Sequence, residues 1–212
     1  MELINVSINN YILGQAGALS ISGNRNIISH MNIVGSGDAL QTNGPLYVTD
    51  SKIVGHGDTI LSVGPAFFIH CHIHSWGSYV WIRNTEGNHG DIFVDSTFET
   101  PDGPAPMALA GPVFLARSPH NHGINYPYAE MVLINCRLKG IPPIGWGQVD
   151  DDTSHVHLWE YNSTNLIDGK PIDARNRHPA SRQLTMKHDA QIIANYSDPT
   201  YIFNGWTPVV DQ

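Results

Sequence analysis

The sequence has little of what marks several large classes of protein. Only two of its 212 residues are cysteines, and 19 acidic residues outnumber 11 basic ones, which gives a net charge of -8. That balance argues against a nucleic acid or an anionic membrane as a partner. No apolar run reaches roughly eighteen residues, and the opening MELINVSINN lacks the basic and apolar regions of a signal peptide. We expect one domain over residues 1–212, large enough to bury a core.

A helical period is also absent from residues 18–77, where one pattern of twenty residues occurs three times instead. The copies read ALSISGNRNIISHMNIVGSG, DALQTNGPLYVTDSKIVGHG and DTILSVGPAFFIHCHIHSWG. Each copy ends in glycine and has isoleucine at one fixed position, namely Ile33, Ile53 and Ile73. A short repeat with β-branched residues and regular glycines is typical of a solenoid. We predict an all-β, single-stranded right-handed parallel β-helix with one repeat per coil.

The period continues more loosely after Gly77. Pro/Gly-rich stretches predict loops, and short apolar stretches predict further strands. The expected segments are a fourth coil over 78–98, loops over 99–112 and 118–127, strands within 131–140 and 156–163, and an irregular stretch over 165–181. Thr185 can cap a short helix through about Asn195, with Ala190, Ile193 and Ala194 available for packing. We expect this helix and the tail, residues 185–212, to pack on the solenoid.

The repeat also predicts how the two cysteines are related. Cys71 and Cys136 fall in one inward column, and Ser96 occupies the coil between them. Two strand spacings separate them by about 10 Å, which is beyond the reach of a disulfide. We therefore predict two buried free thiols.

Two aspartates occupy equivalent positions in the repeat. Asp38 opens the second copy, Asp58 opens the third, and Ser78 follows in the same column. Equivalent positions stack about 4.8 Å apart, so two carboxylates at this spacing must differ in pKa. Such a pair suits division into an acid/base and a nucleophile. The alternative is a pair of solvated aspartates, each following a turn glycine.

Histidines and aromatic residues form two further patterns. His70, His72 and His74 alternate along one expected strand, a geometry that could bind a metal. No carboxylate or cysteine joins them locally, so an exposed histidine face is the favoured interpretation, and neither a metal nor a cofactor is expected. Aromatic residues near the coil edges could stack on sugar rings or simply pack. They are Trp76, Tyr79, Trp81, Tyr126, Tyr128 and Trp146.

A set of short motifs, in order over nearly the whole chain, resembles the pectin methylesterases. NVSINN resembles that family's N-I-T-F-E-N, and QAGALSISGNR its Q-A-V-A-L-R-V-S-G-D-R. IVGSGDAL, SKIVGHGDTIL, LARSP, IPPIGW, WEYNST, SRQLTMKHDAQIIANY and NGWTP follow in the family's order. The resemblance implies the same right-handed parallel β-helix, with the family's first coils missing before this N-terminus.

Carried over by position, the resemblance implies four roles. Asp58 would be the nucleophile, Asp38 the acid/base, and Arg117 the cation that orients the nucleophile and keeps it ionised. Gln15 would stabilise the oxyanion. The implied activity is removal of methyl esters from polygalacturonate or a related polyuronate, without a cofactor.

The chain departs from the family pattern at two positions. Gly37 stands where the family has a second oxyanion-stabilising glutamine, and Pro119 stands where it has a tryptophan. These departures predict weak activity. A second alignment register stays open, in which Asp58 is the acid and Ser78 stands in place of the nucleophile.

The function expected from this resemblance is a carboxylic ester hydrolase. Its partner would be an acidic polysaccharide, and the protein would be a secreted, extracellular or periplasmic monomer. The alternatives are a catalytically weakened β-helix that binds polysaccharide, and a lyase, which would need more carboxylates for calcium. The expected substrate-binding residues are Gly37, Ser78, Trp76, Tyr79, Trp81 and Trp146.

Overall fold

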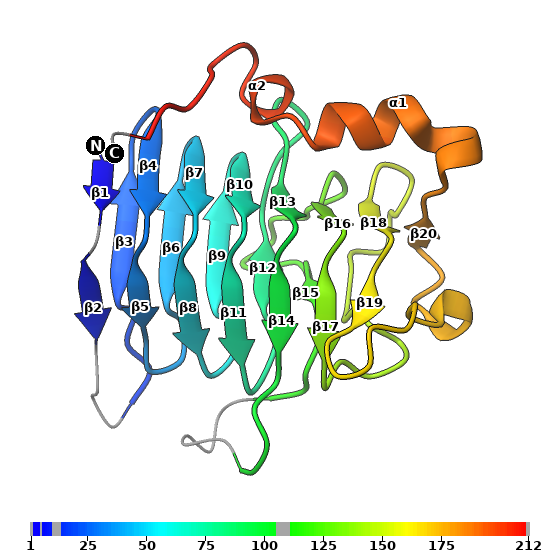
Figure 1. Cartoon of the computed structure of the whole chain (residues 1–212), viewed down its shortest axis with the longest axis horizontal. Helices are drawn as coiled ribbons and strands as arrows, with labels where there is room; N and C mark the ends of the chain where they lie inside the picture. Colours follow the sequence, from blue (N-terminus) through cyan, green and yellow to red (C-terminus); the bar gives the residue numbers. More distant parts are fainter. Residues whose placement is uncertain (1, 5, 10–13, 105–110, 211–212) are drawn as a thin grey trace.

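Short strands joined by sharp turns wind into successive coils, and the strands of each coil pair in parallel with those of the next (Figure 1). The computed structural model describes residues 2–4, 6–9, 14–104 and 111–210. Within these residues the strands form three parallel sheets. The fold is a right-handed parallel β-helix, as the repeat predicted.

The first sheet runs the full length of the solenoid. Its inward residues form part of the core, where the Phe68 and Phe93 rings stack with their centroids 4.4 Å apart. In spatial order its strands are β1 (Glu2–Ile4), β4 (Asn26–Ser29), β7 (Leu46–Thr49), β10 (Ala66–Ile69), β13 (Asp91–Val94), β16 (Glu130–Ile134), β18 (His157–Tyr161) and β20 (Ser181–Gln183).

The second sheet contains the isoleucine column of the repeat. Ile33, Ile53 and Ile73 pair in register and are fully buried, and Phe98 continues the column. The strands are β2 (Ser7–Asn9), β5 (Asn32–Val34), β8 (Lys52–Gly55), β11 (His72–Ser75), β14 (Thr97–Glu99), β17 (Arg137–Lys139) and β19 (Thr164–Asn165).

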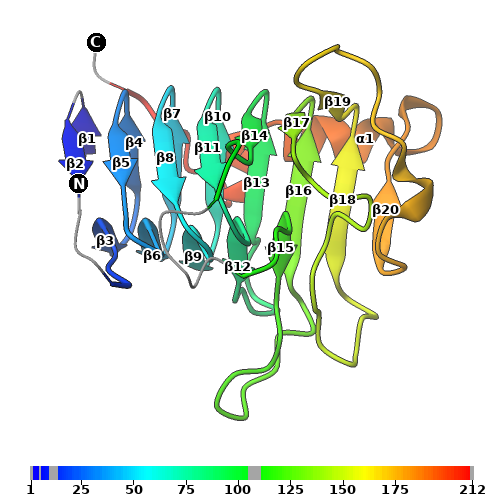
Figure 2. The same cartoon turned by 90° about the horizontal axis from the view of Figure 1, so that it is seen from below.

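The third sheet is shorter and lies along one side of the solenoid in Figure 2. The loop that follows its last strand projects on the same side. The strands are β3 (Leu19–Ser22), β6 (Leu40–Asn43), β9 (Ile60–Val63), β12 (Val80–Ile82) and β15 (Ala116–Arg117).

The turns from the first to the second sheet use one backbone conformation repeatedly. In the six coils whose turn is described, the turn residue has a φ between about 47° and 55°, the left-handed region that histidine, asparagine and aspartate tolerate best among non-glycine residues. His70 therefore lies in a turn and does not share a strand face with His72 and His74, contrary to the sequence prediction. The six turn residues are His30, Asp50, His70, Asp95, Asn135 and Asn162.

The later segments follow the predicted order with some differences. Residues 105–110 of the expected first loop lie outside the described residues. The second loop, over 118–127, contains a small bridge between Asn121 and Ile124. The stretch 165–181 is irregular apart from the end of β19, the first residue of β20 and a short 3-10 helix, Ala174–Asn176.

The C-terminal segment packs on the outer face of the first sheet (Figure 1). It contains α1 (Met186–Tyr196) and a second helix that the sequence analysis missed, α2 (Pro199–Ile202). Ile193 is buried as predicted, but Ala190 and Ala194 are exposed. The buried residues of α1 include Asp189 and Tyr196, so polar anchoring replaces the expected alanine packing.

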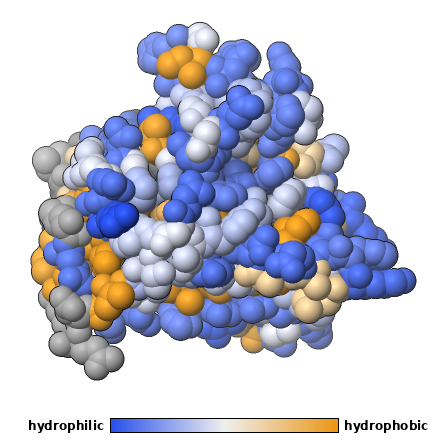
Figure 3. Space-filling model, turned by 90° about the horizontal axis from the view of Figure 1, so that it is seen from above, coloured by the Kyte–Doolittle hydropathy of each residue, from blue (hydrophilic) through white to orange (hydrophobic). Residues whose placement is uncertain are grey.

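Figure 3 views the molecule from the side of these helices. This face is mainly hydrophilic, and hydrophobic residues gather toward the end at which β1 lies. No helix in the described part of the chain is long and apolar enough to cross a membrane.

A buried carboxylate ties α1 to the first sheet. Glu130 on β16 is 4% exposed and accepts hydrogen bonds from His89 Nδ1 at 2.8 Å, His157 Nδ1 at 2.7 Å and the Tyr196 hydroxyl at 2.6 Å. Burial alone would raise the pKa of Glu130, but the donors from His157, His89 and Tyr196 outweigh burial and lower it to about 2. The ionised carboxylate is therefore part of the folded structure.

This network predicts an acid-sensitive contribution to stability. A carboxyl group whose folded pKa lies below its ordinary 4.5 stabilises the fold above that value, and the contribution is lost as pH falls from 4.5 toward about 2. We expect Glu130→Gln to reduce the free energy of unfolding by about 2 kcal/mol at pH 7. The difference from wild type should shrink by pH 3. Urea unfolding of wild type and variant at pH 7 and pH 3 measures this difference in the free energy of unfolding, with Glu86→Gln, at an exposed position, as the control. A difference that does not change with pH would contradict an ionised Glu130 in the folded protein.

The cysteine prediction is confirmed by the register. Cys71 and Cys136 are free and buried, and Ser96 of the intervening coil accepts a hydrogen bond from the Cys71 amide at 3.0 Å. Burial raises the pKa of both thiols to about 12.

Both thiols should therefore resist a thiol reagent in the folded protein and react, two per chain, in denaturant without reductant. Titration with a chromogenic disulfide measures this. Rapid reaction of either thiol under native conditions would show that the coil containing it opens readily.

Candidate functional site

The two aspartates occupy one stacked column at the edge of the third sheet. Asp38 and Asp58 each lie two residues before a strand, and those strands, β6 and β9, pair with Leu40 opposite Ile60. Ser78 has the same position before β12. Adjacent coils thus stack the two backbone positions about one strand spacing apart, as predicted, and the charge of Asp58 acts on Asp38.

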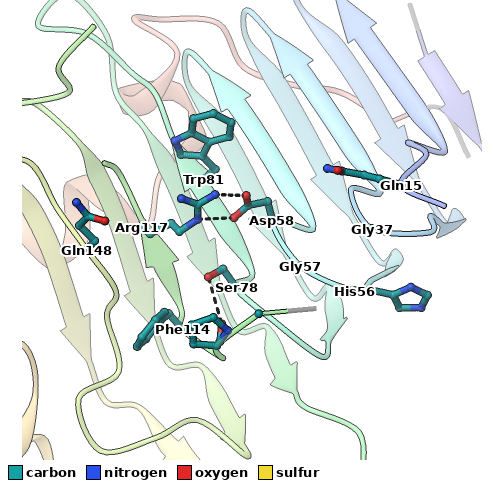
Figure 4. A pocket seen from close by; sticks show the side chains of 12 residues that line it. Gln15, Gly37, His56, Gly57, Asp58, Ser78, Trp81, Phe114, Arg117 and Gln148 are labelled. Carbon is teal, nitrogen blue, oxygen red and sulfur yellow. Dashed lines mark hydrogen bonds and ion pairs between the residues drawn. The ribbon is translucent and has the colours of Figure 1, made fainter. Parts of the chain in front are cut away.

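Asp58 is held by a fixed backbone and by a cation. Its φ is 43°, a left-handed conformation that aspartate tolerates, and it follows Gly57, whose φ is 150°. Arg117 on β15 donates from Nε to Asp58 Oδ1 at 2.8 Å and from its terminal nitrogen to Oδ2 (Figure 4). This two-point contact fixes the plane of the carboxylate and places a positive charge beside it.

Arg117 is positioned by the sheet and by an indole ring. Its strand pairs with β12, so Arg117 lies directly opposite Trp81, and the guanidinium carbon is 5.2 Å from the centre of that ring. The hydrogen bond to Asp58 raises the pKa of Arg117. The cation therefore stays charged beside Asp58.

Asp38 has a different environment. Gln15 Nε2 donates to Asp38 Oδ1 at 2.9 Å. Burial raises the pKa of Asp38, the Gln15 hydrogen bond partly offsets this, and the charge of Asp58 raises it further. The two carboxylates are thus differentiated, one paired with a cation and the other biased toward its protonated form.

A cleft of about 570 Å³ opens over this column. Six of the expected residues line it, namely Gln15, Gly37, Asp58, Ser78, Trp81 and Arg117. The other four, Asp38, Trp76, Tyr79 and Trp146, are not among its lining residues, and Asp38 lies behind Gln15, to which it is hydrogen-bonded. His56, Phe114 and Gln148 line it as well and were missed by the sequence analysis. His56 could have been found from the repeat, because it precedes Gly57 in the column of Ser36 and Trp76. Phe114 and Gln148 come from segments outside the regular period.

Several aromatic residues do not have the expected role. Tyr79 and Trp146 are 0% and 1% exposed and belong to the hydrophobic core, so neither can stack on a sugar. Trp76 packs edge-on against the His56 ring. Tyr126 is buried, and Tyr128 stacks on His155. The burial of Tyr79, Tyr126 and Trp146 depends on the neighbours that each ring meets in the folded chain, which aromatic content alone does not give.

Gly37 has a backbone that other residues rarely adopt. Its φ is 101°, and a Cβ there would lie 2.9 Å from Gln15 Cγ. A glutamine at position 37 would therefore strain the backbone and displace Gln15. Gly37 is a requirement of this local structure as well as a departure from the family pattern.

The histidines of β11, His72 and His74, lie next to a carboxylate of the neighbouring coil. Glu99 at the end of β14 lies directly opposite His74 on β11. The sequence analysis, which found no carboxylate near the histidines, was wrong because Glu99 is distant along the chain. This group lies on the second sheet, away from the cleft.

Fold and cleft together define a parallel β-helix with an Asp–Arg pair and a second carboxylate on one sheet. No family model and no curated protein matches the sequence. Solved structures match the fold. A pectin methylesterase from carrot has a TM-score of 0.70 at 16% identity, covering 96% of this chain and 65% of that one. The pectin methylesterase PemA from Erwinia chrysanthemi has a TM-score of 0.66 at 18% identity, covering 99% and 71%.

A further pectin methylesterase, solved in complex with a hexasaccharide, has a TM-score of 0.66 at 19% identity, covering 99% of this chain and 71% of that chain. At these identities the likeness shows a shared fold.

The strain at Gly37 generates a prediction. Gly37→Ala should reduce the free energy of unfolding by about 1–2 kcal/mol, and Gly37→Gln by at least as much, because both place a Cβ at a positive φ. Chemical denaturation measures this, with Gly87→Ala as the matched control, since a Cβ at Gly87 meets nothing within 4 Å. Wild-type stability of Gly37→Gln would show that the backbone here adapts.

Proposed function

We propose that this protein is a carboxylic ester hydrolase that removes methyl esters from polygalacturonate or a related polyuronate. The observation that supports this most directly is the pair of differentiated carboxylates, Asp58 bound by Arg117 and Asp38 with a raised pKa. The likeness of the fold to pectin methylesterases supports the substrate class.

In the proposed first step, a carboxylate oxygen of Asp58 attacks the ester carbonyl carbon. The carbonyl electron pair moves to oxygen, and the tetrahedral intermediate then collapses with loss of the methoxy group. Asp38, protonated, donates its proton to that group, so methanol leaves. The product of this half-reaction is an anhydride between Asp58 and the uronate.

The second step regenerates the enzyme. Asp38, now ionised, takes a proton from a water molecule, and the resulting hydroxide attacks the uronate carbonyl of the anhydride. The bond to Asp58 breaks, which frees its carboxylate for Arg117 to bind again and releases the uronate acid. No cofactor is required for either step.

Stabilisation of the oxyanion is the weak point of this site. The Gln15 amide donates one N–H to Asp38, which leaves its second N–H for the oxyanion. Gly37 offers no side-chain donor, and loss of one such donor typically costs about 3 kcal/mol of transition-state stabilisation. The proposed enzyme is accordingly slow. Because Gly37→Gln would displace Gln15, we do not expect that substitution to improve turnover.

The arrangement favours the first of the two alignment registers. Arg117 contacts Asp58, whereas the Ser78 hydroxyl donates to the Pro112 carbonyl at 3.4 Å. A serine nucleophile needs a base that accepts the proton of its hydroxyl. Among the described residues that line the cleft, no histidine or carboxylate accepts a hydrogen bond from Ser78. We therefore assign the nucleophile to Asp58.

Three substitutions test the mechanism by methanol release from methylated pectin. Asp58→Asn keeps the left-handed backbone but removes the nucleophile, so activity should fall by at least about a thousandfold. Asp38→Asn should reduce methanol release by a comparable factor, because an amide can neither protonate the departing methoxy group nor activate water. Asp50→Asn, another aspartate with a positive φ of 48°, lies in a turn outside the cleft and should keep wild-type activity.

The same experiment separates the rival functions. Unchanged methanol release in Asp58→Asn would overturn the assignment of the nucleophile. Pectin binding by wild-type protein without any methanol release would indicate the polysaccharide-binding function. Calcium-dependent formation of unsaturated product would indicate a lyase.

A further inference from the structure

We propose that His72, His74 and Glu99 form a binding site for a divalent transition metal, with Zn²⁺ as the best fit, on the outer face of the second sheet. The site is separate from the cleft and does not rest on the proposed esterase activity. It would connect two adjacent coils, because the histidines belong to β11 and the glutamate to β14.

The strand geometry brings the three side chains to one face. His72 and His74 are two residues apart on β11, and the intervening Ile73 is fully buried, so both imidazoles point outward. Glu99 lies directly opposite His74 in the parallel pair. One potential ligand atom from each residue lies within 4.8 Å of the others.

The distances between these side chains are long for hydrogen bonds and close to those between the ligands of one ion. Glu99 Oε2 lies 3.3 Å from His72 Nε2 and 3.7 Å from His74 Nε2, and His74 Nε2 lies 3.4 Å from His72 Nδ1. For ligands about 2.0–2.1 Å from a tetrahedral zinc, neighbouring ligand atoms lie about 3.3 Å apart. The observed spacing therefore leaves room for the ion between the three groups.

Three other histidine–carboxylate pairs in the described residues lie at ordinary hydrogen-bond distances: His120 is 2.6 Å from Asp150, and His157 and His89 are 2.7 and 2.8 Å from Glu130. A fourth pair, His70 with Asp50, is 3.6 Å apart, but both of its side chains are exposed. In the proposed site, His72 Nε2 is buried and makes no hydrogen bond of good geometry. A bound metal ion would give this buried nitrogen a partner.

The surroundings keep the ligands in suitable orientation and charge. Lys139 Nζ donates to Glu99 Oε1 at 3.0 Å, which leaves Oε2 directed at the imidazoles. A hydrogen bond to the second oxygen of a metal-binding carboxylate is a common support for such sites.

The donor set and the nearby charges select the class of metal. Lys52 lies opposite His72 on the neighbouring strand β8, Arg137 lies two strands away on β17, and Lys139 offsets much of the charge of Glu99. Calcium and magnesium depend on several anionic oxygens, which this site does not offer. Two imidazole nitrogens with one carboxylate suit zinc, with water as the fourth ligand.

The test is titration of the metal-free full chain with Zn²⁺, followed by calorimetry and by thermal unfolding. We expect one equivalent to bind and to raise the unfolding temperature, whereas Ca²⁺ and Mg²⁺ should do neither. His74→Ala and Glu99→Gln should each weaken zinc binding by at least about tenfold. His70→Ala is the matched control, because this exposed histidine lies two residues from His72 but in the turn.

Cobalt provides a second readout that does not depend on stability. Co²⁺ bound to the wild-type protein should give the intense visible absorption of a four- or five-coordinate ion, and His72→Asn should abolish it. Equal zinc affinity in wild type, His74→Ala and Glu99→Gln would overturn the proposal. Loss of binding in His70→Ala alone would overturn it too, since another histidine set would then hold the ion. Methanol release should not depend on zinc.

Discussion

The parallel hydrogen-bond register between adjacent coils is the constraint on which the rest of this structure depends. It places each side chain above its equivalent in the next coil, so one residue type repeated along the chain becomes a column in space. Inside, Ile33, Ile53 and Ile73 become a continuous apolar core. At the edge of the third sheet, the same register converts two distant aspartates into an interacting pair.

The solenoid leaves three outer faces that serve separate purposes. The first sheet is covered by the C-terminal helices, held by apolar contacts and by the ionised Glu130. The second presents the histidine–glutamate group, and the third contributes the cleft. Because coils are linked mainly to their neighbours, a substitution on one face should have little effect on another. The proposed metal site and the proposed active site can therefore be tested independently.

Electrostatic asymmetry within the cleft gives otherwise similar groups different roles. Arg117 contacts only one of the two stacked aspartates, and Gln15 contacts the other. The cation is paired with Asp58, while burial and the charge of Asp58 raise the pKa of Asp38. At Gly37, by contrast, the backbone conformation limits the chemistry, since it excludes the side-chain donor that the pectin methylesterase pattern would place there.

The sequence by itself determined the coil period, the inward columns and the pairing of Asp38 with Asp58, because these follow from a local repeat and a fixed strand spacing. Tertiary structure alone decided the inward direction of Tyr79 and Trp146, and the approach of Glu99 to the histidines. Those features depend on loops that break the period and on contacts between residues far apart in the chain. A regular backbone can be read from its repeat; the partners that meet across irregular insertions are fixed only when the chain packs.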